Sequence, residues 1–484
     1  MAGAAGILLS LALSSAPLPP AKATKRVAPS GKAHLDPTFG EAGRVVLPLS
    51  AGGRVISVLM PDDGLVIGGG RSLLRLTPDG HVDESFGQGG TLTPPAPAGG
   101  SFEIDGLAVD SKDRLIVAGT SLLSTEDSSS SVPVSSGAED GPQAARVLRY
   151  LQGGTLDPSF GADGSVETDL GLPAPRDETG QQILSKPWVE VSGVAVDSRD
   201  RILLTGGASA GLEFGCSHDW NFNTLTYAAF VARLTESGAL DAGFAGDGVL
   251  GGASVAENPL HVEASVARGI GPGDELIYQP GRIRCWGKAG DYGLVRLSSS
   301  GELSPSFGAG GVAREGEGEA VVAPDGAIVT HGFVSPWYYP KEPARIQVVR
   351  LRPDGRVNRS FGHGGETVVT SPGGAGGILE AAAMDARRRV LLGGTMISGN
   401  GRRRGRDGQA KEPRRRSFVL VRLGVRGRID RAFGPYGRIA TRFGSLGVTG
   451  LHLLVDSRER AIMVGVYGSS KDRGLALARY VLGG

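Results

Sequence analysis

One short phrase occurs seven times along the chain, and this internal repeat constrains the fold more than any other feature of the sequence. In its clearest form the phrase is Leu-Asp-Pro-Ser-Phe-Gly, and a further glycine follows shortly after it. The phenylalanines of the seven copies are Phe39, Phe86, Phe160, Phe244, Phe307, Phe361 and Phe433. Because the phrase returns throughout the chain, we expect one structural unit to be built seven times.

The segments between the copies have the character of β-strands. Two aliphatic runs flank a polar turn in AVDSKDRLIVAGT (108–120), which indicates a β-hairpin. A third run with alternating apolar residues follows, as in ARVLRYLQGG (145–154), and the phrase then leads into a fourth run such as GRVVLPL (43–49). Within the phrase, we expect aspartate and proline to start a turn, phenylalanine to fill an apolar gap, and the glycines to adopt positive φ angles.

Four strands per repeat without any helical periodicity predict an all-β fold, a seven-bladed β-propeller of four-stranded antiparallel blades. We name the strands of a blade a, b, c and d in chain order. The chain begins with a lone d strand at 43–49 and ends after strand c of the last repeat. We therefore expect the N-terminal strand to pair with the C-terminal blade, which closes the ring and covers its open edges.

The repeat resembles the delta-60 repeat of exported and surface proteins of bacteria, on the basis of LDPSFGADG (156–164) and AVDSRDRILLTGG (195–207). Strands a to c are also similar to NHL-type propeller repeats. The resemblance implies a propeller fold. It implies no defined reaction and supplies no catalytic residues.

The net charge bears on the partner of the protein, and the N-terminal segment bears on its compartment. Since 51 basic residues balance 50 acidic ones, net charge gives no case for nucleic acid or an anionic membrane as the partner. An apolar run at about 6–13 before Ala21-Lys22-Ala23 is typical of a secretory signal, and no stretch approaches the ~20 apolar residues of a membrane span. We predict a signal peptide at 1–23, a linker at 24–33 and a single propeller domain at 34–484. The expected protein is a soluble monomer that is secreted, periplasmic or attached to the cell surface.

The b–c and d–a connections are long, whereas the a–b and c–d turns are short. Because strands alternate in direction, the long connections leave each blade on one side, where we expect the recognition surface. The aromatic residues expected to contact a ligand are Trp188, Trp220, Tyr292, Trp286, Trp337, Tyr338 and Tyr339. Large aromatic rings in loops favour sugars or protein surfaces. The alternatives are neutral drift of loop length and small local cores under the loops.

Two further features lie in the b–c connections. Cys216 and Cys285 occupy equivalent connections of adjacent blades, and a disulfide between them is the prediction for an exported chain, with two independent thiols as the alternative. A basic connection contains Arg402, Arg403, Arg404, Arg414, Arg415 and Arg416. Such a run either holds an anionic polymer or is simply solvated.

Catalytic signals are weak, and we predict no catalytic residue, metal or cofactor. Ser209 lies in a GASAG pattern (207–211), but the helix that follows a nucleophilic serine is missing. Glu213, His218 and Asp219 lack the spacing of a zinc site. The hypothesis is a non-enzymatic binding or scaffold protein for cell-envelope glycan or a surface protein. The alternatives are a polysaccharide hydrolase or lyase with carboxylates at the central channel, and a structural spacer.

Overall fold

The computed structural model describes residues 32–48, 54–122, 143–174, 182, 186–214, 223–251, 264–281, 293–315, 318–333, 344–371, 377–398, 415–468 and 473–484. Within these ranges the protein is all-β, and the one helical element is the short 3-10 turn η1 (Pro435–Gly437). No helix of the described residues is long and apolar enough to cross a bilayer.

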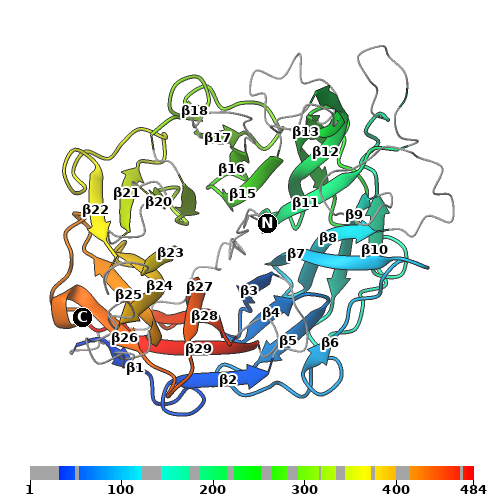
Figure 1. Ribbon diagram of the computed structural model, residues 1–484. Coiled ribbons are helices and arrows are strands. Elements are labelled where there is room, and N and C mark those ends of the chain that lie inside the picture. Colours follow the sequence, from blue (N-terminus) through cyan, green and yellow to red (C-terminus); the bar gives the residue numbers. More distant parts are fainter. Residues whose placement is uncertain are drawn as a thin grey trace. The chain divides into compact units, whose positions relative to one another are not determined.

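The strands form seven antiparallel sheets, which confirms the predicted seven-bladed β-propeller (Figure 1). Blade 1 contains β3 (Val55–Leu59), β4 (Leu65–Gly69), β5 (Ser72–Leu76) and β6 (Thr91–Leu92). Blade 2 contains β7 (Ser101–Val109), β8 (Leu115–Leu122), β9 (Gln143–Tyr150) and β10 (Ser165–Thr168). Blade 3 contains β11 (Val189–Val196), β12 (Ile202–Phe214), β13 (Asn223–Leu234) and β14 (Val249–Gly251).

The remaining blades repeat this order of strands. Blade 4 contains β15 (Ala264–Ile270), β16 (Leu276–Gly281), β17 (Leu294–Leu297) and β18 (Val312–Ala313). Blade 5 contains β19 (Glu319–Val322), β20 (Ile328–Phe333), β21 (Arg345–Leu351) and β22 (Glu366–Thr370). Blade 6 contains β23 (Ile378–Met384), β24 (Val390–Ser398), β25 (Arg415–Leu423) and β26 (Arg438–Thr441).

Blade 7 obtains its outer strand from the other end of the chain, as predicted. Its own strands are β27 (Val448–Val455), β28 (Arg460–Tyr467) and β29 (Gly474–Val481). The strand β2 (Arg44–Pro48) pairs antiparallel with β29, and the two-residue β1 (His34–Leu35) pairs further along the same strand. The predicted d strand at 43–49 is thus present at 44–48, and β1 makes this sheet five-stranded.

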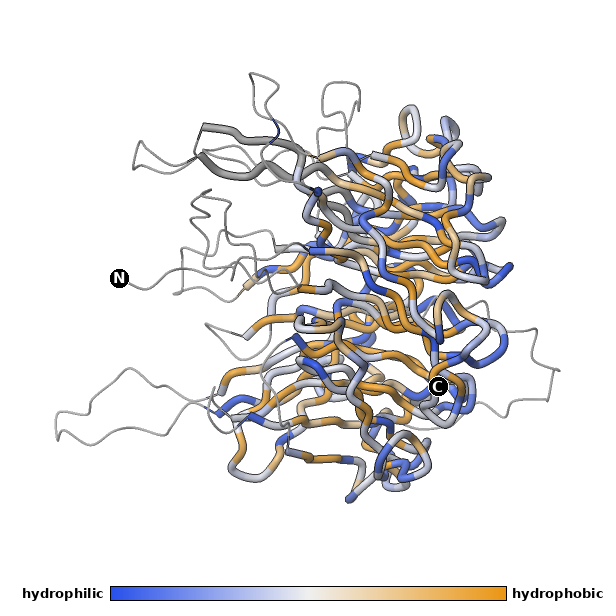
Figure 2. Tube along the Cα trace, turned by 90° about the vertical axis from the view of Figure 1, so that its right-hand side faces the viewer, coloured by the Kyte–Doolittle hydropathy of each residue, from blue (hydrophilic) through white to orange (hydrophobic). Residues whose placement is uncertain are grey.

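The chain divides into two compact units, each with its own apolar core. The described residues of one unit are Ile67–Leu74 and most of Glu84–Ser304, and those of the other lie before residue 67, in Arg75–Asp83 and in Pro305–Gly484. Phe160, Leu204 and Phe230 belong to the core of the first unit, and Phe418 and Tyr480 belong to that of the second. In Figure 2, apolar residues run along the strands and hydrophilic residues gather at the turns.

The repeated phrase holds a buried arginine, which was not anticipated from the sequence. Arg149 lies on β9 with 2% of its surface exposed, and its guanidinium carbon is 4.7 Å from the centre of the Phe160 ring. Its Nε donates to Asp157 at 2.8 Å, and Nη1 donates to the backbone oxygen of Glu236 in the next blade. Phe160 and Asp157 therefore compensate a buried charge by cation–π contact and ion pairing.

The same arrangement recurs along the chain. Arginine, phenylalanine and aspartate are grouped in this way in Arg233–Phe244–Asp241, Arg422–Phe433–Asp430 and Arg479–Phe39–Asp36, with ring distances of 4.8, 4.5 and 4.6 Å. The predicted turn role of the aspartate is also confirmed, since Asp157 accepts hydrogen bonds from Ser159 N and Oγ. The phrase is therefore a turn and an arginine-binding element at once.

The a–b turns join three pairs of neighbouring blades by a second repeated contact. Asp200 adopts a left-handed conformation with φ 59°, and its carboxylate accepts bonds of 2.8 Å from both N and Oγ of Ser111. Asp274 accepts equivalent bonds from Ser198, and Asp63 accepts them from Ser457. Aspartate tolerates the left-handed region better than most residues, which explains its recurrence at this turn position.

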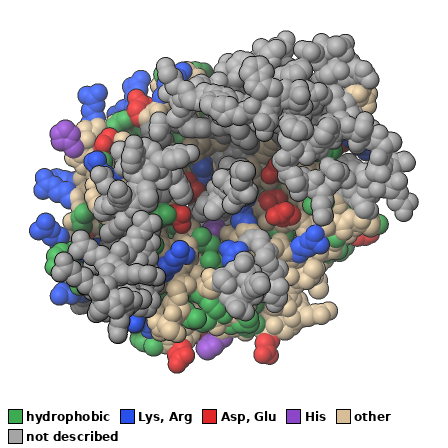
Figure 3. All heavy atoms as spheres, viewed as in Figure 1, with side chains coloured by type: hydrophobic (Ala, Val, Ile, Leu, Met, Phe, Trp, Pro, Cys, Tyr) green, Lys and Arg blue, Asp and Glu red, His purple; other side chains and the backbone are tan. Residues whose placement is uncertain are grey.

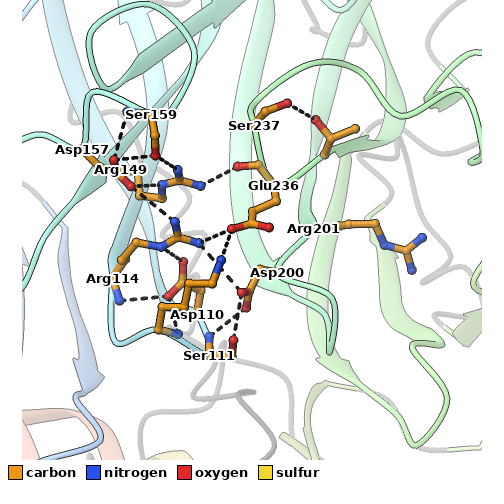
Figure 4. A network of polar contacts seen from close by, with 12 residues as sticks. Asp110, Ser111, Arg114, Arg149, Asp157, Ser159, Asp200, Arg201, Glu236 and Ser237 are labelled. Carbon is orange, nitrogen blue, oxygen red and sulfur yellow. Dashed lines mark hydrogen bonds and ion pairs between the residues drawn. The ribbon is translucent and has the colours of Figure 1, made fainter.

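A second arginine ties these two contacts together in the first unit (Figure 4). Arg114, at the start of β8, pairs with Asp110 at 2.6 Å and with Glu236 at 3.0 Å. It also lies 3.4 Å from Asp157 and 3.8 Å from Asp200. Carboxylates from two neighbouring blades, Asp110 and Asp157 of blade 2 and Asp200 and Glu236 of blade 3, thus share one guanidinium, which fixes these two blades relative to each other at their short turns.

Candidate functional site

The a strands carry a β-bulge at one repeated position, and the residue in the bulge differs from blade to blade. The register shifts by one residue at this position in β7, β11, β15, β23 and β27. The bulge residues are Asp105, Ser192, Arg268, Glu380 and Leu451. A bulge redirects a side chain out of the regular alternation and is often found beside functional sites. We therefore define these positions as the candidate site.

In the first unit the candidate site is acidic. Glu103 and Asp105 lie on β7, and Glu190 lies at the position of Glu103 in the neighbouring strand β11. Figure 3 shows Asp and Glu side chains gathered where β7 and β11 lie in Figure 1. Asp105 accepts a 3.0 Å bond from Thr120 Oγ1, and this oxygen accepts a 3.1 Å bond from Val191 N of β11. The carboxylate is therefore held by the contact between blades 2 and 3.

A buried arginine lies at the same bulge position in blade 4. Arg268 is 6% exposed, and its Nε and Nη2 donate to Gln279 Oε1 at 3.0 and 2.7 Å. Gln279 lies on β16, directly beside β15 in the sheet. The first unit thus presents carboxylates, a guanidinium and hydroxyl groups at one level of its a strands. Such groups are suited to hydrogen-bonding a ligand rich in hydroxyls.

In the second unit the bulge residues are Leu451 on β27 and Glu380 on β23, of which only Glu380 is ionisable. Its side chain is half-buried, and it forms no hydrogen bond or ion pair with the other residues that the structure describes. Burial raises the pKa of Glu380 above its usual range, because the charged carboxylate loses hydration. The protonated carboxyl, which can donate a hydrogen bond or a proton, therefore persists to higher pH in Glu380 than in an exposed glutamate. Among the described residues, no three His, Cys, Asp or Glu side chains are grouped so as to hold a metal ion.

In contrast to Glu380, the aspartates of the repeated phrase have lowered pKa values. Burial by itself would raise the pKa of Asp157, but hydrogen bonds from Ser159 and the charge of Arg149 lower this pKa to about 2. The pKa of Asp241 is likewise lowered, since a bond from Gly243 N and the Arg233 charge outweigh its burial. These carboxylates remain ionised and fully paired, so their role is structural.

Two of the described residues that were singled out from the sequence, Trp188 and Ser209, are buried. Trp188 is 7% exposed, so its ring offers little surface to a ligand and takes part in local packing. Its backbone N–H donates to the hydroxyl of Ser209 at 2.8 Å, and Ser209 N donates back to the Trp188 oxygen at 2.9 Å. Ser209 is 1% exposed on the central strand β12, where its hydroxyl stabilises the backbone and cannot meet a substrate.

Most of the other predicted site residues lie outside the described ranges. These are Trp220, Trp286, Trp337, Tyr292, Tyr338, Tyr339, Cys216, Cys285, Arg402, Arg403, Arg404 and Arg414. Arg415 and Arg416 are described at the start of β25, where both are exposed and pair in register with Ser398 and Ile397. The aromatic surface and the disulfide therefore stay predictions.

The bulge residues were missed from the sequence, although one signal was present. Asp105 precedes Gly106, and a Cβ at Gly106 would lie 2.7 Å from Val194 of the neighbouring blade. A glycine inside a strand pattern indicates a bulge or a close approach of two backbones. The same strand position is glycine in blades 2 and 3, at Gly106 and Gly193.

Comparison with known families supports the propeller repeat. The family model "Domain of unknown function (DUF5122) beta-propeller" matches residues 135–160, a stretch that includes β9 and the second-blade phrase. No curated protein matches the sequence.

Several solved structures resemble the chain at low identity. A protein of unknown function from Bacteroides caccae is 11% identical with a TM-score of 0.31, over 64% of this chain and 82% of that one. A protein of unknown function from Dyadobacter fermentans is 12% identical with a TM-score of 0.39, over 80% and 96% of the two chains. A gluconolactonase from Xanthomonas campestris is 12% identical with a TM-score of 0.31, over 95% and 99%. At these identities and TM-scores the likeness carries no argument for a shared activity.

Proposed function

We propose that this chain is an exported, non-enzymatic binding or scaffold protein of the delta-60 type. In this proposal it recognises cell-envelope glycan or a surface protein through the b–c and d–a connections of its blades. The aromatic residues Trp220, Trp286 and Trp337 supply the binding contacts, and the signal peptide at 1–23 directs the chain out of the cytoplasm. Trp188 is not included, because its ring is buried.

The difference between the two ends of the strands is the observation that carries the proposal. At the a–b and c–d turns, residues of the repeat bind one another across neighbouring blades, as Ser111 and Asp200 do. At the other end the chain adds segments that do not belong to the repeat, such as the one that joins Leu122 of β8 to Gln143 of β9. Non-repeat segments on a rigid repeat framework are the usual place for recognition.

Retention on envelope material tests the proposal. The purified chain is incubated with cell-envelope fragments, sedimented and quantified, and a variant with Trp220→Ala, Trp286→Ala and Trp337→Ala is compared with it. We expect the variant to lose at least about 90% of its retention, which corresponds to the loss of aromatic anchors worth a few kcal/mol. Undiminished retention would overturn the proposal.

Tyr436→Ala is the matched control. Tyr436 is the most exposed large aromatic side chain of the described residues, at 84%, and it lies next to β26 at the c–d end of blade 6. The substitution removes an exposed ring at the c–d end of the strands, opposite to the b–c and d–a connections of the proposed binding surface. We expect retention equal to that of the unchanged chain, with the same melting temperature.

A second candidate function, a hydrolase or lyase acting on polysaccharide, is favoured by Glu380. Its half-buried position at a bulge and its raised pKa suit a general acid. Purified protein is assayed against a panel of polysaccharides for release of reducing or unsaturated ends. Turnover that disappears in Glu380→Gln supports the enzyme, and saturable binding without product supports the binding module.

A further inference from the structure

A hollow of about 570 Å³ on the second unit is lined by four arginines. It lies between residues 308–315, which lead into and past β18, and residues 352–359, the c–d turn of blade 5. The arginines that line it are Arg314, Arg352, Arg356 and Arg359, and Glu315 is the one carboxylate among the lining residues. We name this hollow the arginine groove.

The two walls of the arginine groove are fixed before any ligand binds. Gly308 N donates to the backbone oxygen of Asp354 at 2.8 Å, which joins one wall to the other. A Cβ at Gly355 would lie 2.8 Å from both Gly308 N and the Phe307 ring, so the walls meet without intervening space. The turn itself is closed by hydrogen bonds between Arg352 and Arg356 and from Arg356 N to the Asp354 carboxylate. The groove is therefore preorganised by the repeat contacts.

Two of the four guanidinium groups in the groove, those of Arg356 and Arg359, have no partner among the residues that the structure describes. All four arginines are exposed, and Arg352 forms one exposed ion pair of 2.9 Å with Asp354. Figure 3 shows Lys and Arg side chains projecting along the left margin, where β21 and β22 lie in Figure 1.

Equivalent positions in another part of the repeat show that the fold does not need these arginines. Counted from the phrase phenylalanines, the residues of the first unit at the four positions are Glu167, Thr235, Ala239 and Ala242. None is basic, and Glu167 is acidic, yet the local contacts are the same: Gly161 N donates to Ser237 O as Gly308 N does to Asp354 O. In the first unit the same surface is therefore built without any of the four positive charges, so the fold does not require them.

We propose that the arginine groove binds a ligand with several linked phosphate groups. Guanidinium groups bind phosphate through paired N–H donors, and several of them around one hollow neutralise adjacent phosphates together. A single phosphate ion is much smaller than the groove, so the size fits linked phosphates of a polymer or an oligophosphate. The groove opens at a c–d turn, away from the b–c connections of the proposed function, and the two proposals stand or fall independently.

Isothermal titration calorimetry with inorganic tripolyphosphate tests this site. The groove variant carries Arg356→Gln and Arg359→Gln. The control variant carries Arg428→Gln and Arg431→Gln, which are exposed arginines at the same two repeat positions of blade 6 and do not line the groove. Both variants lose the same charge, so a general loss of electrostatic attraction affects them alike.

We expect the unchanged chain to bind tripolyphosphate, with an affinity that falls as salt rises from about 50 to about 150 mM. The groove variant is expected to bind at least about tenfold more weakly, whereas the control variant binds as before. Equal melting temperatures establish that both variants are folded. Absence of binding, an equal loss in both variants, or citrate binding as tightly as tripolyphosphate each overturn the proposal.

Discussion

Arg479 and Phe39, from opposite ends of the sequence, are in direct contact, with the guanidinium carbon 4.6 Å from the centre of the ring. The Nε atom of Arg479 donates to Asp36 at 2.9 Å, and Nη1 donates to the backbone oxygen of Pro78 in blade 1. Arg479 is fully buried. The N-terminal residues thus complete the phrase site of blade 7 and supply the counter-charge for its arginine.

Removal of the N-terminal strands is therefore expected to destabilise the second unit. A chain that begins at residue 49 loses β1 and β2 and leaves Arg479 buried without Asp36. Relative to a chain that begins at residue 32, we expect its melting temperature to fall by about 10 °C or more. Circular dichroism measures the change, and a synthetic peptide of residues 32–48 is expected to restore the loss as its concentration rises. Equal melting temperatures would show that the pairing contributes little.

Arg149→Met tests the buried arginine of the phrase. The substitution keeps much of the side-chain volume but leaves Asp157 without its 2.8 Å partner. We expect a loss of about 3 kcal/mol in the free energy of unfolding by urea. Arg428→Met, at an exposed position, is the control and is expected to change stability by less than about 0.5 kcal/mol.

Coupling between the two charges distinguishes ion pairing from simple packing. Combining Arg149→Met with Asp157→Asn removes both charges, so the double variant is expected to lose less than the sum of the single losses, by about 1 kcal/mol or more. Strict additivity would mean that the arginine acts through its contacts with Phe160, Ser159 and the Glu236 oxygen and not through the ion pair.

The sequence was sufficient to predict the architecture, because the pattern of each strand and turn occurs in seven copies. The turn role of Asp157 followed from its neighbours along the chain, and the closure by residues 43–49 followed from counting strands. The burial of Arg149 did not follow, since it depends on the c–d turn of the next blade, whose Glu236 oxygen covers the guanidinium. A signal was present all the same: an arginine recurs in every c strand, at Arg75, Arg149, Arg233, Arg296, Arg350, Arg422 and Arg479.

The candidate site depends on interactions that a single sequence does not display. Asp105 is redirected by a shift in register between β7 and β8, and such a shift depends on the pairing of two strands. The arginine groove combines two segments, 308–315 and 352–359, that approach because Gly355 packs on Phe307 and Gly308 N donates to Asp354 O. Trp188 was expected at a binding surface, but its proximity to the central strand β12 buries the ring.

Gly238→Ala is expected to disrupt the contact between neighbouring blades. Gly238 has φ +97°, and a Cβ there would lie 2.6 Å from Val166 and 3.0 Å from the Phe160 ring. Gly246→Ala is the matched control, because Gly246 has φ +93° but open space around the added Cβ. We expect about 1 kcal/mol of destabilisation at Gly246 from backbone strain alone, and about 3 kcal/mol at Gly238 from strain and overlap. Equal losses in urea unfolding would mean that the turn adjusts without cost.

Because of His452, we expect the free energy of unfolding to decrease as pH falls from 6.5 to about 4. Its ring is buried on β27, and Nε2 donates to the backbone oxygen of Val55 at 2.7 Å. Burial lowers the pKa of His452 from 6.5 to about 4, more than the bond to Val55 raises it. Between these pH values the unfolded chain binds a proton that the folded chain does not, so the free energy of unfolding decreases as pH falls from 6.5 to about 4, by about 3 kcal/mol in total.

His452→Gln isolates this contribution. The glutamine amide retains a donor for the Val55 oxygen but does not titrate. Urea unfolding of both proteins at a series of pH values gives the difference in stability, which removes the contribution of all other groups. This difference is expected to be constant above pH 7 and to change in favour of the variant as pH falls below 6.5. A difference that stays constant down to pH 4 would mean that the folded protein takes up the proton as readily as the unfolded chain, and that burial of the ring does not disfavour the charged imidazolium.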